Sequence, residues 1–167
     1  GQDVLDFKRA LDRYADAVVQ YDLGHYEDAA ETFFALVTTR ALEQGGFGWE
    51  AEWYLAESLF ELGNDDLAED EYRAIADDLS HPFRDDAVRR LLEIYSRDDD
   101  AAKFDALYQA EIVRGRVAPT DVILYSVGRA FQRKGDTLKA KSYFNEIEKT
   151  SPYWARAQCQ LGAMLVA

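Results

Sequence analysis

The sequence is poor in the residues that break, bend or cross-link a chain. Its 167 residues include 3 Pro, 10 Gly and a single cysteine, Cys159. So few turn residues exclude a fold of many short strands, and one cysteine excludes an internal disulfide. No apolar run approaches the roughly 18 residues that a membrane-spanning helix needs. Hydrophobic residues still make up 48% of the chain, and we therefore expect one helical domain with a sizeable core.

Basic residues are also scarce, and the charges are unevenly distributed. Lys and Arg number 19 against 32 Asp and Glu, which gives a net charge of −13. This charge argues against a nucleic-acid partner, because phosphate contacts need a basic face. Residues 47–80 hold 11 acidic side chains and 1 basic one, whereas residues 118–167 hold 4 and 7. The acidic segment is either an ordinary solvated surface or a field that steers a basic partner.

Side-chain patterns for catalysis or metal binding are missing too. His25 and His81 lie far apart, and Cys159 has no histidine near it in the sequence. The acidic run at residues 98–100 lacks the alternating ligands and the glycine of a calcium loop, and is expected to begin a helix. The glycines within residues 45–48 precede no Lys-Ser/Thr pair, so we interpret them as a flexible connection and not as a phosphate loop. We predict no enzyme activity, no metal and no cofactor.

The most informative feature of the chain is an internal repeat. Residues 36 positions apart are similar in four columns that run from one helical stripe through a turn to a second stripe. These columns are Leu55/Leu91/Val127, Gly63/Asp99/Gly135, Ala68/Phe104/Ala140 and Tyr72/Tyr108/Phe144. An earlier copy lies 39 residues upstream of the second and contains Ala17, Gly24, Ala29 and Phe33. After Pro152, a last half-copy repeats Val127-Gly128 as Leu161-Gly162.

Each copy predicts two helices joined by a tight turn. A small residue in the first helix, such as Ala56 or Gly128, allows a neighbouring helix to approach closely. A glycine such as Gly63 can adopt the positive φ that closes a helix. In the second helix an alanine precedes an aromatic residue by four positions, so both lie on one face.

With these residues the chain resembles the tetratricopeptide repeat family over residues 8–167. The fourth copy is the most similar, and the third departs from the family pattern at Asp99, Phe104 and Glu111. The resemblance implies an all-α fold, a right-handed α-solenoid of antiparallel helix pairs. We expect a single domain, part of a longer protein, with repeats at residues 8–46, 47–80, 81–117 and 118–151 and a trailing helix at residues 152–167.

The repeats are longer than is usual for this family. Their lengths of 36 and 39 residues exceed the common length of about 34, and the helices are acidic and rich in tyrosine. In these respects the chain is similar to bacterial envelope members of the family. The expected location is therefore the periplasm or the cell envelope, with the cytoplasm left open.

The resemblance also implies a function, that of a non-enzymatic scaffold whose first helices line a concave groove for another protein or a peptide. Trp53 and Tyr125 are the expected anchors of the partner. The acidic second repeat suits a segment with basic residues, and Arg129 with Arg133 suits an acidic stretch. The expected groove residues are Tyr14, Tyr21, Glu50, Trp53, Glu57, Phe60, Tyr125, Arg129 and Arg133.

Two other functions stay open from the sequence. One is a structural spacer or self-association segment of a larger solenoid. A homodimer would then form through the trailing helix, whose apolar residues Leu161, Met164 and Leu165 need a cover. The other is a regulatory domain that senses a small peptide. Insertion of this segment into a membrane is expected in none of these cases.

Overall fold

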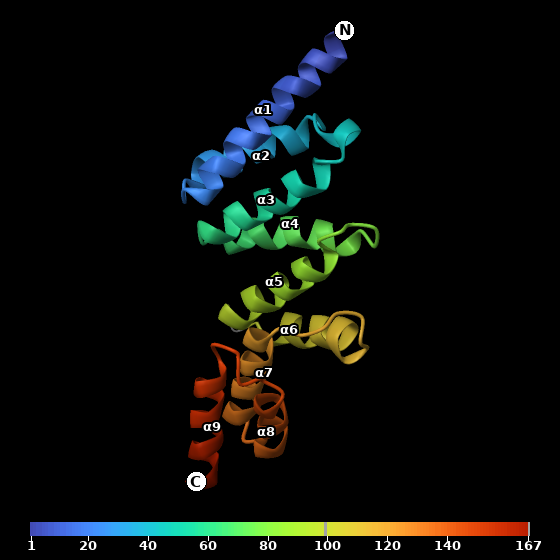
Figure 1. The fold of residues 1–167 in the computed structure, drawn as a ribbon. Coiled ribbons are helices and arrows are strands. Elements are labelled where there is room, and N and C mark those ends of the chain that lie inside the picture. The colour runs from blue at the N-terminus through green and yellow to red at the C-terminus, as the bar shows by residue number, and fades with distance from the viewer. Residues whose placement is uncertain (99, 167) are drawn as a thin grey trace. The chain divides into compact units, whose positions relative to one another are not determined.

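The computed structural model describes residues 1–98 and 100–166, and of residue 44 the backbone alone. Within these residues all regular secondary structure is helical and no strand occurs (Figure 1). The chain separates into two compact units, Gly1–Leu91 and Leu92–Ala167. None of the helices in the described ranges is long and apolar enough to cross a membrane.

The first unit contains two complete helix pairs. α1 (Gln2–Asp22) pairs with α2 (Tyr26–Thr38), and α3 (Gly48–Glu61) pairs with α4 (Asp65–Asp77). A short 3₁₀ helix, η1 (Glu43–Gly45), connects the two pairs, and α2 packs against α3. α5 (Arg84–Arg97) begins in the first unit, and the boundary between the units falls within it.

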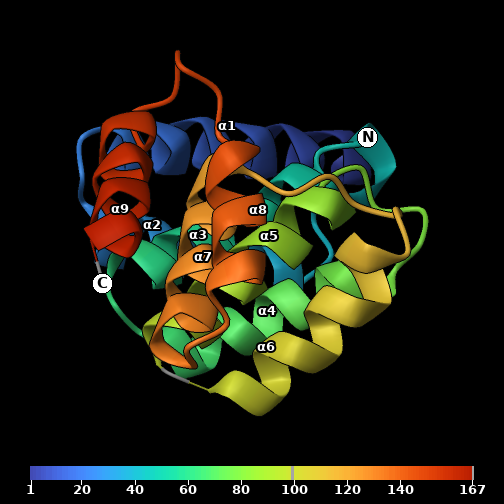
Figure 2. The same ribbon diagram turned by 90° about the horizontal axis from the view of Figure 1, so that it is seen from below.

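The second unit contains the shorter helices. α6 (Ala101–Leu107) continues into a π-helical segment, η2 (Tyr108–Val113). α7 (Asp121–Arg133) and α8 (Thr137–Asn145) lie side by side, as Figure 1 and Figure 2 both show. α9 (Trp154–Val166) packs against α8.

The same backbone turn ends α1, α3 and α7, at the three glycines that the repeat places there. The φ angles of Gly24, Gly63 and Gly135 are 80°, 73° and 79°, a region that only glycine adopts without cost. In each turn the residue after the glycine donates its N–H to the carbonyl five residues earlier, which closes the helix end. These bonds join His25 to Gln20 at 2.8 Å, Asn64 to Leu59 at 3.0 Å and Asp136 to Phe131 at 3.0 Å.

The third pair keeps this register, although its turn residue, Asp99, lies outside the described residues. The Asp100 N–H donates to the Tyr95 carbonyl at 3.0 Å, in step with the bonds in the neighbouring turns. Oδ1 of Asp100 then accepts the Lys103 N–H at 3.1 Å and caps α6. Asn64 and Asp136, each 36 residues away, cap α4 and α8 in the same way. Asp100 in the acidic run therefore acts as a helix cap, as expected.

The predicted small and aromatic positions form the core. The second helices of the first, second and fourth pairs bury an alanine and an aromatic residue completely, with 0% exposure: Ala29 and Phe33, Ala68 and Tyr72, Ala140 and Phe144. The glycine of α7 shows why the first helix needs a small residue. A Cβ atom at Gly128 would lie 2.6 Å from the ring of Phe144. The expected close approach of the two helices is confirmed here.

The third pair has a different second helix. Phe104 is half-buried where the other pairs have a buried alanine, and it stacks on Tyr108 with ring centroids 5.7 Å apart. From Tyr108 onward the helix is π-helical, and Glu111 is buried where other pairs have Ile75 and Ile147. Of the three departures seen in the sequence, Glu111 thus lies in the segment where the helix changes its geometry, and Phe104 lies in α6 just before it.

The glycine-rich connection between the first two pairs is a packed turn. Leu42 is 1% exposed at its start. A Cβ atom at Gly45 would lie 2.1 Å from the ring of Phe7 in α1, so the backbone lies directly against that ring. The interpretation of a flexible connection is therefore corrected: the glycines serve close packing and the positive φ of Gly46, which is 78°.

Candidate protein-binding surface

Tyr14 and Tyr21, the two groove tyrosines expected in α1, are half-buried against the second helix pair. Their rings lie 6.3 Å and 5.2 Å from the ring of Tyr54 in α3. Burial, followed by the nearby Tyr54 and Glu50, raises the pKa of Tyr14 to about 12. Burial and then the charge of Glu57 raise the pKa of Tyr21 to about 12. Both tyrosines therefore contribute to the packing between α1 and α3.

Glu57 is the most buried of the expected groove residues, at 6% exposure. Its carboxylate accepts two hydrogen bonds of 2.9 Å from the guanidinium group of Arg90 in α5, and a third from the hydroxyl of Tyr72 in α4. The guanidinium also lies 4.6 Å from the centroid of the Phe60 ring. Burial first, and then the charge and hydrogen bond of Glu57, raise the pKa of Tyr72 far above its usual range. The network joins three helices through one carboxylate.

Trp53 packs within an aromatic cluster that includes the loop before α5. Its ring stacks on Phe83 at 5.3 Å and lies 5.6 Å from Tyr72. His81 in this loop is 4% exposed, and its Nδ1 accepts the Phe83 N–H at 3.1 Å. Its Nε2 therefore carries the proton and donates to Glu52 Oε2 at 3.1 Å. His81 fixes the loop against α3.

Glu50, Glu57 and Glu61 lie along one face of α3, because their spacing follows the helical period. We call these three residues the acidic stripe. Glu50 is half-buried and Glu61 is exposed. Oε2 of Glu50 is buried and has no hydrogen-bond partner in the described part of the chain. Within the described residues, both oxygens of the middle carboxylate are thus bonded to the protein, whereas one oxygen of Glu50 is not.

The three expected groove residues in α7 have different surroundings. Tyr125 is half-buried, and its ring lies 5.7 Å from Phe144 and 5.6 Å from Tyr153. Nη1 of Arg129 donates to Gln160 Oε1 at 2.5 Å, which links α7 to α9. Arg133 is exposed at the end of the helix. Six of the nine expected residues belong to the first unit and three to the second, so a continuous groove stays a prediction.

Sequence reasoning missed Arg90 and Tyr72 as partners of Glu57. A signal was present for Arg90, which lies 33 residues after Glu57 and so close to one repeat length away. Opposite charges at this offset are brought to the same junction of neighbouring first helices. Tyr72 gave no such signal, because every pair has an aromatic residue at this position of the repeat and core packing alone accounts for it.

The residues weighed for metal or thiol chemistry have ordinary positions. His25 directly precedes α2, and its Nδ1 lies 2.7 Å from Gln20 Oε1. Cys159 is exposed on α9. In the described ranges, no group of three or more His, Cys, Asp or Glu side chains could hold a metal ion.

Comparison with known proteins identifies one of the repeats. Residues 50–78, which include most of α3 and all of α4, match the family model described as Tetratricopeptide repeat. The nearly identical TPR-like repeats of a kinesin light chain from Podosopora anserina have a similar solved structure, with a TM-score of 0.59 and 16% identity over 96% of this chain and 92% of that chain. No curated protein gives a significant match. Residues 50–78 thus match a tetratricopeptide repeat, and the structural similarity shows that the chain has an all-α solenoid fold.

Proposed function

We propose that the chain is a non-catalytic scaffold whose acidic stripe binds a polypeptide segment with basic residues. Tetratricopeptide repeats generally mediate binding between proteins. The matched repeat is also the most acidic part of this chain, because residues 47–80 hold 11 acidic side chains and 1 basic one. Such a surface attracts cationic segments and speeds their association.

The observation that carries the proposal is the bond between Glu57 and Arg90. The middle of the stripe already holds one guanidinium group, through two bonds of 2.9 Å and the ring of Phe60. Glu50 and Glu61 continue the stripe on either side of Glu57 on the same helix. A partner arginine at either position would find the same chemistry, a carboxylate on a partly aromatic surface.

The proposal is tested with peptides selected on the protein itself. Random twelve-residue peptides displayed on phage are selected on the wild-type chain, and those retained are expected to be enriched in Arg and Lys. Their binding should weaken at high salt and with Glu61→Lys, since salt screens exposed charges. Asp70→Lys, at an exposed position on α4, makes the same change of charge, and this variant should bind the retained peptides as the wild type does. Retained peptides without an excess of basic residues, or equal loss in both variants, would refute the proposal.

The cellular setting that we propose is a bacterial envelope assembly. It is supported by the long repeats and the acidic, tyrosine-rich helices. Fractionation of the native cells is expected to place the protein in the periplasm or at the membrane. Recovery in the cytoplasm alone would contradict this part of the proposal and leave the peptide-binding part intact.

Self-association through α9 is a second candidate function, favoured by the contrast between two glycines. Gly128 of α7 lies under the ring of Phe144, whereas Gly162 of α9, its counterpart in the repeat, has nothing within 4 Å of its Cβ position. Leu165 on the same helix is 78% exposed. We propose that a second copy covers this face. Sedimentation should show a dimer that Gly162→Leu disrupts. Ala163→Leu, an exposed position turned by about 100° from Gly162 on the same helix, should preserve it, and a monomer at all concentrations would refute the proposal.

A further inference from the structure

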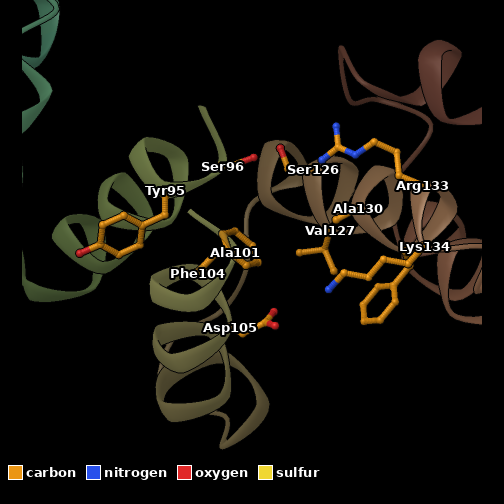
Figure 3. Close-up of a pocket in the computed structure, with 11 residues that line it drawn as sticks. Tyr95, Ser96, Ala101, Phe104, Asp105, Ser126, Val127, Ala130, Arg133 and Lys134 are labelled. Atoms are coloured by element: carbon orange, nitrogen blue, oxygen red, sulfur yellow. The ribbon is translucent and has the colours of Figure 1, made fainter. Parts of the chain in front are cut away.

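A cavity of about 190 Å³ lies within the second unit, among the end of α5, α6 and α7 (Figure 3). It shares no residue with the acidic stripe. Of the expected groove residues it includes only Arg133. Its lining residues are Tyr95, Ser96, Ala101, Phe104, Asp105, Ser126, Val127, Ala130, Phe131, Arg133 and Lys134.

The centre of the cavity is apolar. Figure 3 shows Phe104 and Ala101 of α6 facing Val127 and Ala130 of α7 across it. A dry cavity of about 150 Å³ with apolar walls is enough to hold a benzene molecule. The space here can therefore take one ring or one branched aliphatic side chain. It has an opening as well as walls, since Ala101 is exposed.

One side of the cavity is basic. The amine of Lys134 extends toward the space between α7 and α6, and Arg133 lies beside it in sequence at the helix end (Figure 3). Asp105 is the only acidic residue that lines this part of the described chain. The whole chain has a net charge of −13, yet residues 118–167 hold 7 basic and 4 acidic side chains. An anionic group is therefore tolerated better here than beside α3 or α4.

The cavity lies where the repeat is irregular. Phe104 occupies the column in which the other pairs have Ala29, Ala68 and Ala140, all with 0% exposure. The larger side chain is only half-buried and contributes to the wall of the cavity. The opening is thus a property of this pair, and the shared pattern of the repeats does not produce it.

We propose that this cavity binds a Phe- or Leu-sized side chain of a partner polypeptide that has a glutamate or aspartate beside it. The apolar side chain lies between Phe104 and Val127, and the neighbouring carboxylate pairs with Lys134. The inference rests on the proposed function only in that the chain binds polypeptides. Its ligand is opposite in charge to the one proposed for the acidic stripe, so the two sites are separable.

Three tripeptides test the site by two-dimensional NMR titration of the labelled protein. Acetyl-Glu-Phe-Glu-amide is expected to shift the backbone amides around Phe104, Val127 and Ala130 saturably, in the millimolar range suited to so small a ligand. Acetyl-Gln-Phe-Gln-amide should bind at least threefold more weakly, because it lacks the charge. Acetyl-Glu-Ala-Glu-amide should give no saturable shift, because it lacks the ring.

Matched variants locate the binding. Ala130→Phe fills the cavity and should abolish the titration, while Ala163→Phe, exposed on α9, should leave it unchanged. Lys134→Gln, a surface change that keeps the fold, should remove the difference between the Glu and Gln peptides, and Lys149→Gln should keep it. Shifts that centre elsewhere, or a folded Ala130→Phe variant that binds normally, would overturn the proposal. If the wild-type chain binds the selected basic peptides but none of the three tripeptides, the cavity site is refuted and the acidic stripe is not.

Discussion

Two glycines at the same place in the repeat are expected to respond in opposite ways to alanine. Gly128 lies in the middle of α7 and Gly162 in the middle of α9. At Gly128 an added Cβ would lie 2.6, 2.9 and 2.9 Å from three atoms of the Phe144 ring. At Gly162 it would meet nothing within 4 Å. Gly128→Ala should therefore destabilise the second unit relative to Gly162→Ala.

The size of the difference follows from two terms. Alanine is favoured over glycine inside a helix by about 0.5–1 kcal/mol, and this gain is common to both variants. Overpacking of a filled core costs about 1–3 kcal/mol. It applies only at Gly128, because the ring of Phe144 is fully buried and cannot move into solvent. The two variants should thus differ in free energy of unfolding by about 1–3 kcal/mol.

The assay is urea unfolding followed by circular dichroism, with amide hydrogen exchange in α7 and α8 to isolate the second unit. It is performed at a concentration where sedimentation shows a monomer. Phe144→Leu removes ring atoms, so Gly128→Ala should cost at least about 1 kcal/mol less in that background. Equal stability of the two alanine variants, or no coupling to residue 144, would refute the packing argument.

Three further predictions rest on single contacts. Gly45→Ala should destabilise the first unit by about 1–3 kcal/mol in urea unfolding, because its Cβ would lie 2.1 Å from the Phe7 ring, and Phe7→Leu should restore part of the loss. Asp136→Ala should cost about 0.5–2 kcal/mol in thermal unfolding through the lost cap of α8, whereas Asp136→Asn should cost less. Burial raises the pKa of Tyr14 and Tyr21 from 10.0 to about 12, so the folded state holds these protons more tightly than the unfolded state. Their stabilisation should be complete below pH 10 and decline as the pH rises through 12, and denaturation at several pH values should show a smaller decline in the Tyr14→Phe, Tyr21→Phe double variant.

The sequence predicted the parts of the fold that depend on a repeated local requirement. A turn that needs a positive φ selects glycine, and Gly24, Gly63 and Gly135 all have it. A helix that must lie close to another selects alanine or glycine under an aromatic ring, as at Gly128 and Phe144. These requirements recur with the period of the repeat, so self-similarity alone reveals them.

The candidate site could not be predicted from the repeat, because the neighbours of an aromatic residue in the first helix of a pair decide whether its side chain is exposed. Trp53 has the spacing of a groove residue, yet it stacks on Phe83, which lies in a loop outside the repeated columns. Glu57 reads as a surface acid, but the bonds from Arg90 and Tyr72 make it part of the interior. The contacts with Phe83 and Tyr72 do not follow from the repeat, so the periodic pattern could not predict them, whereas the offset of Arg90 from Glu57 was a signal.

The third pair shows that a failure of the pattern can itself be informative. In the other pairs the alanine column keeps the second helix against its neighbours, and each such alanine is completely buried. Phe104 breaks this column, and the cavity and the π-helical segment both occur in its pair. Local rules tend to be broken where function requires it, and a binding site and a packing defect predict different results when the cavity is filled. Ala130→Phe separates the two: filling a mere defect raises stability and changes no binding, whereas filling a site also abolishes the titration with acetyl-Glu-Phe-Glu-amide.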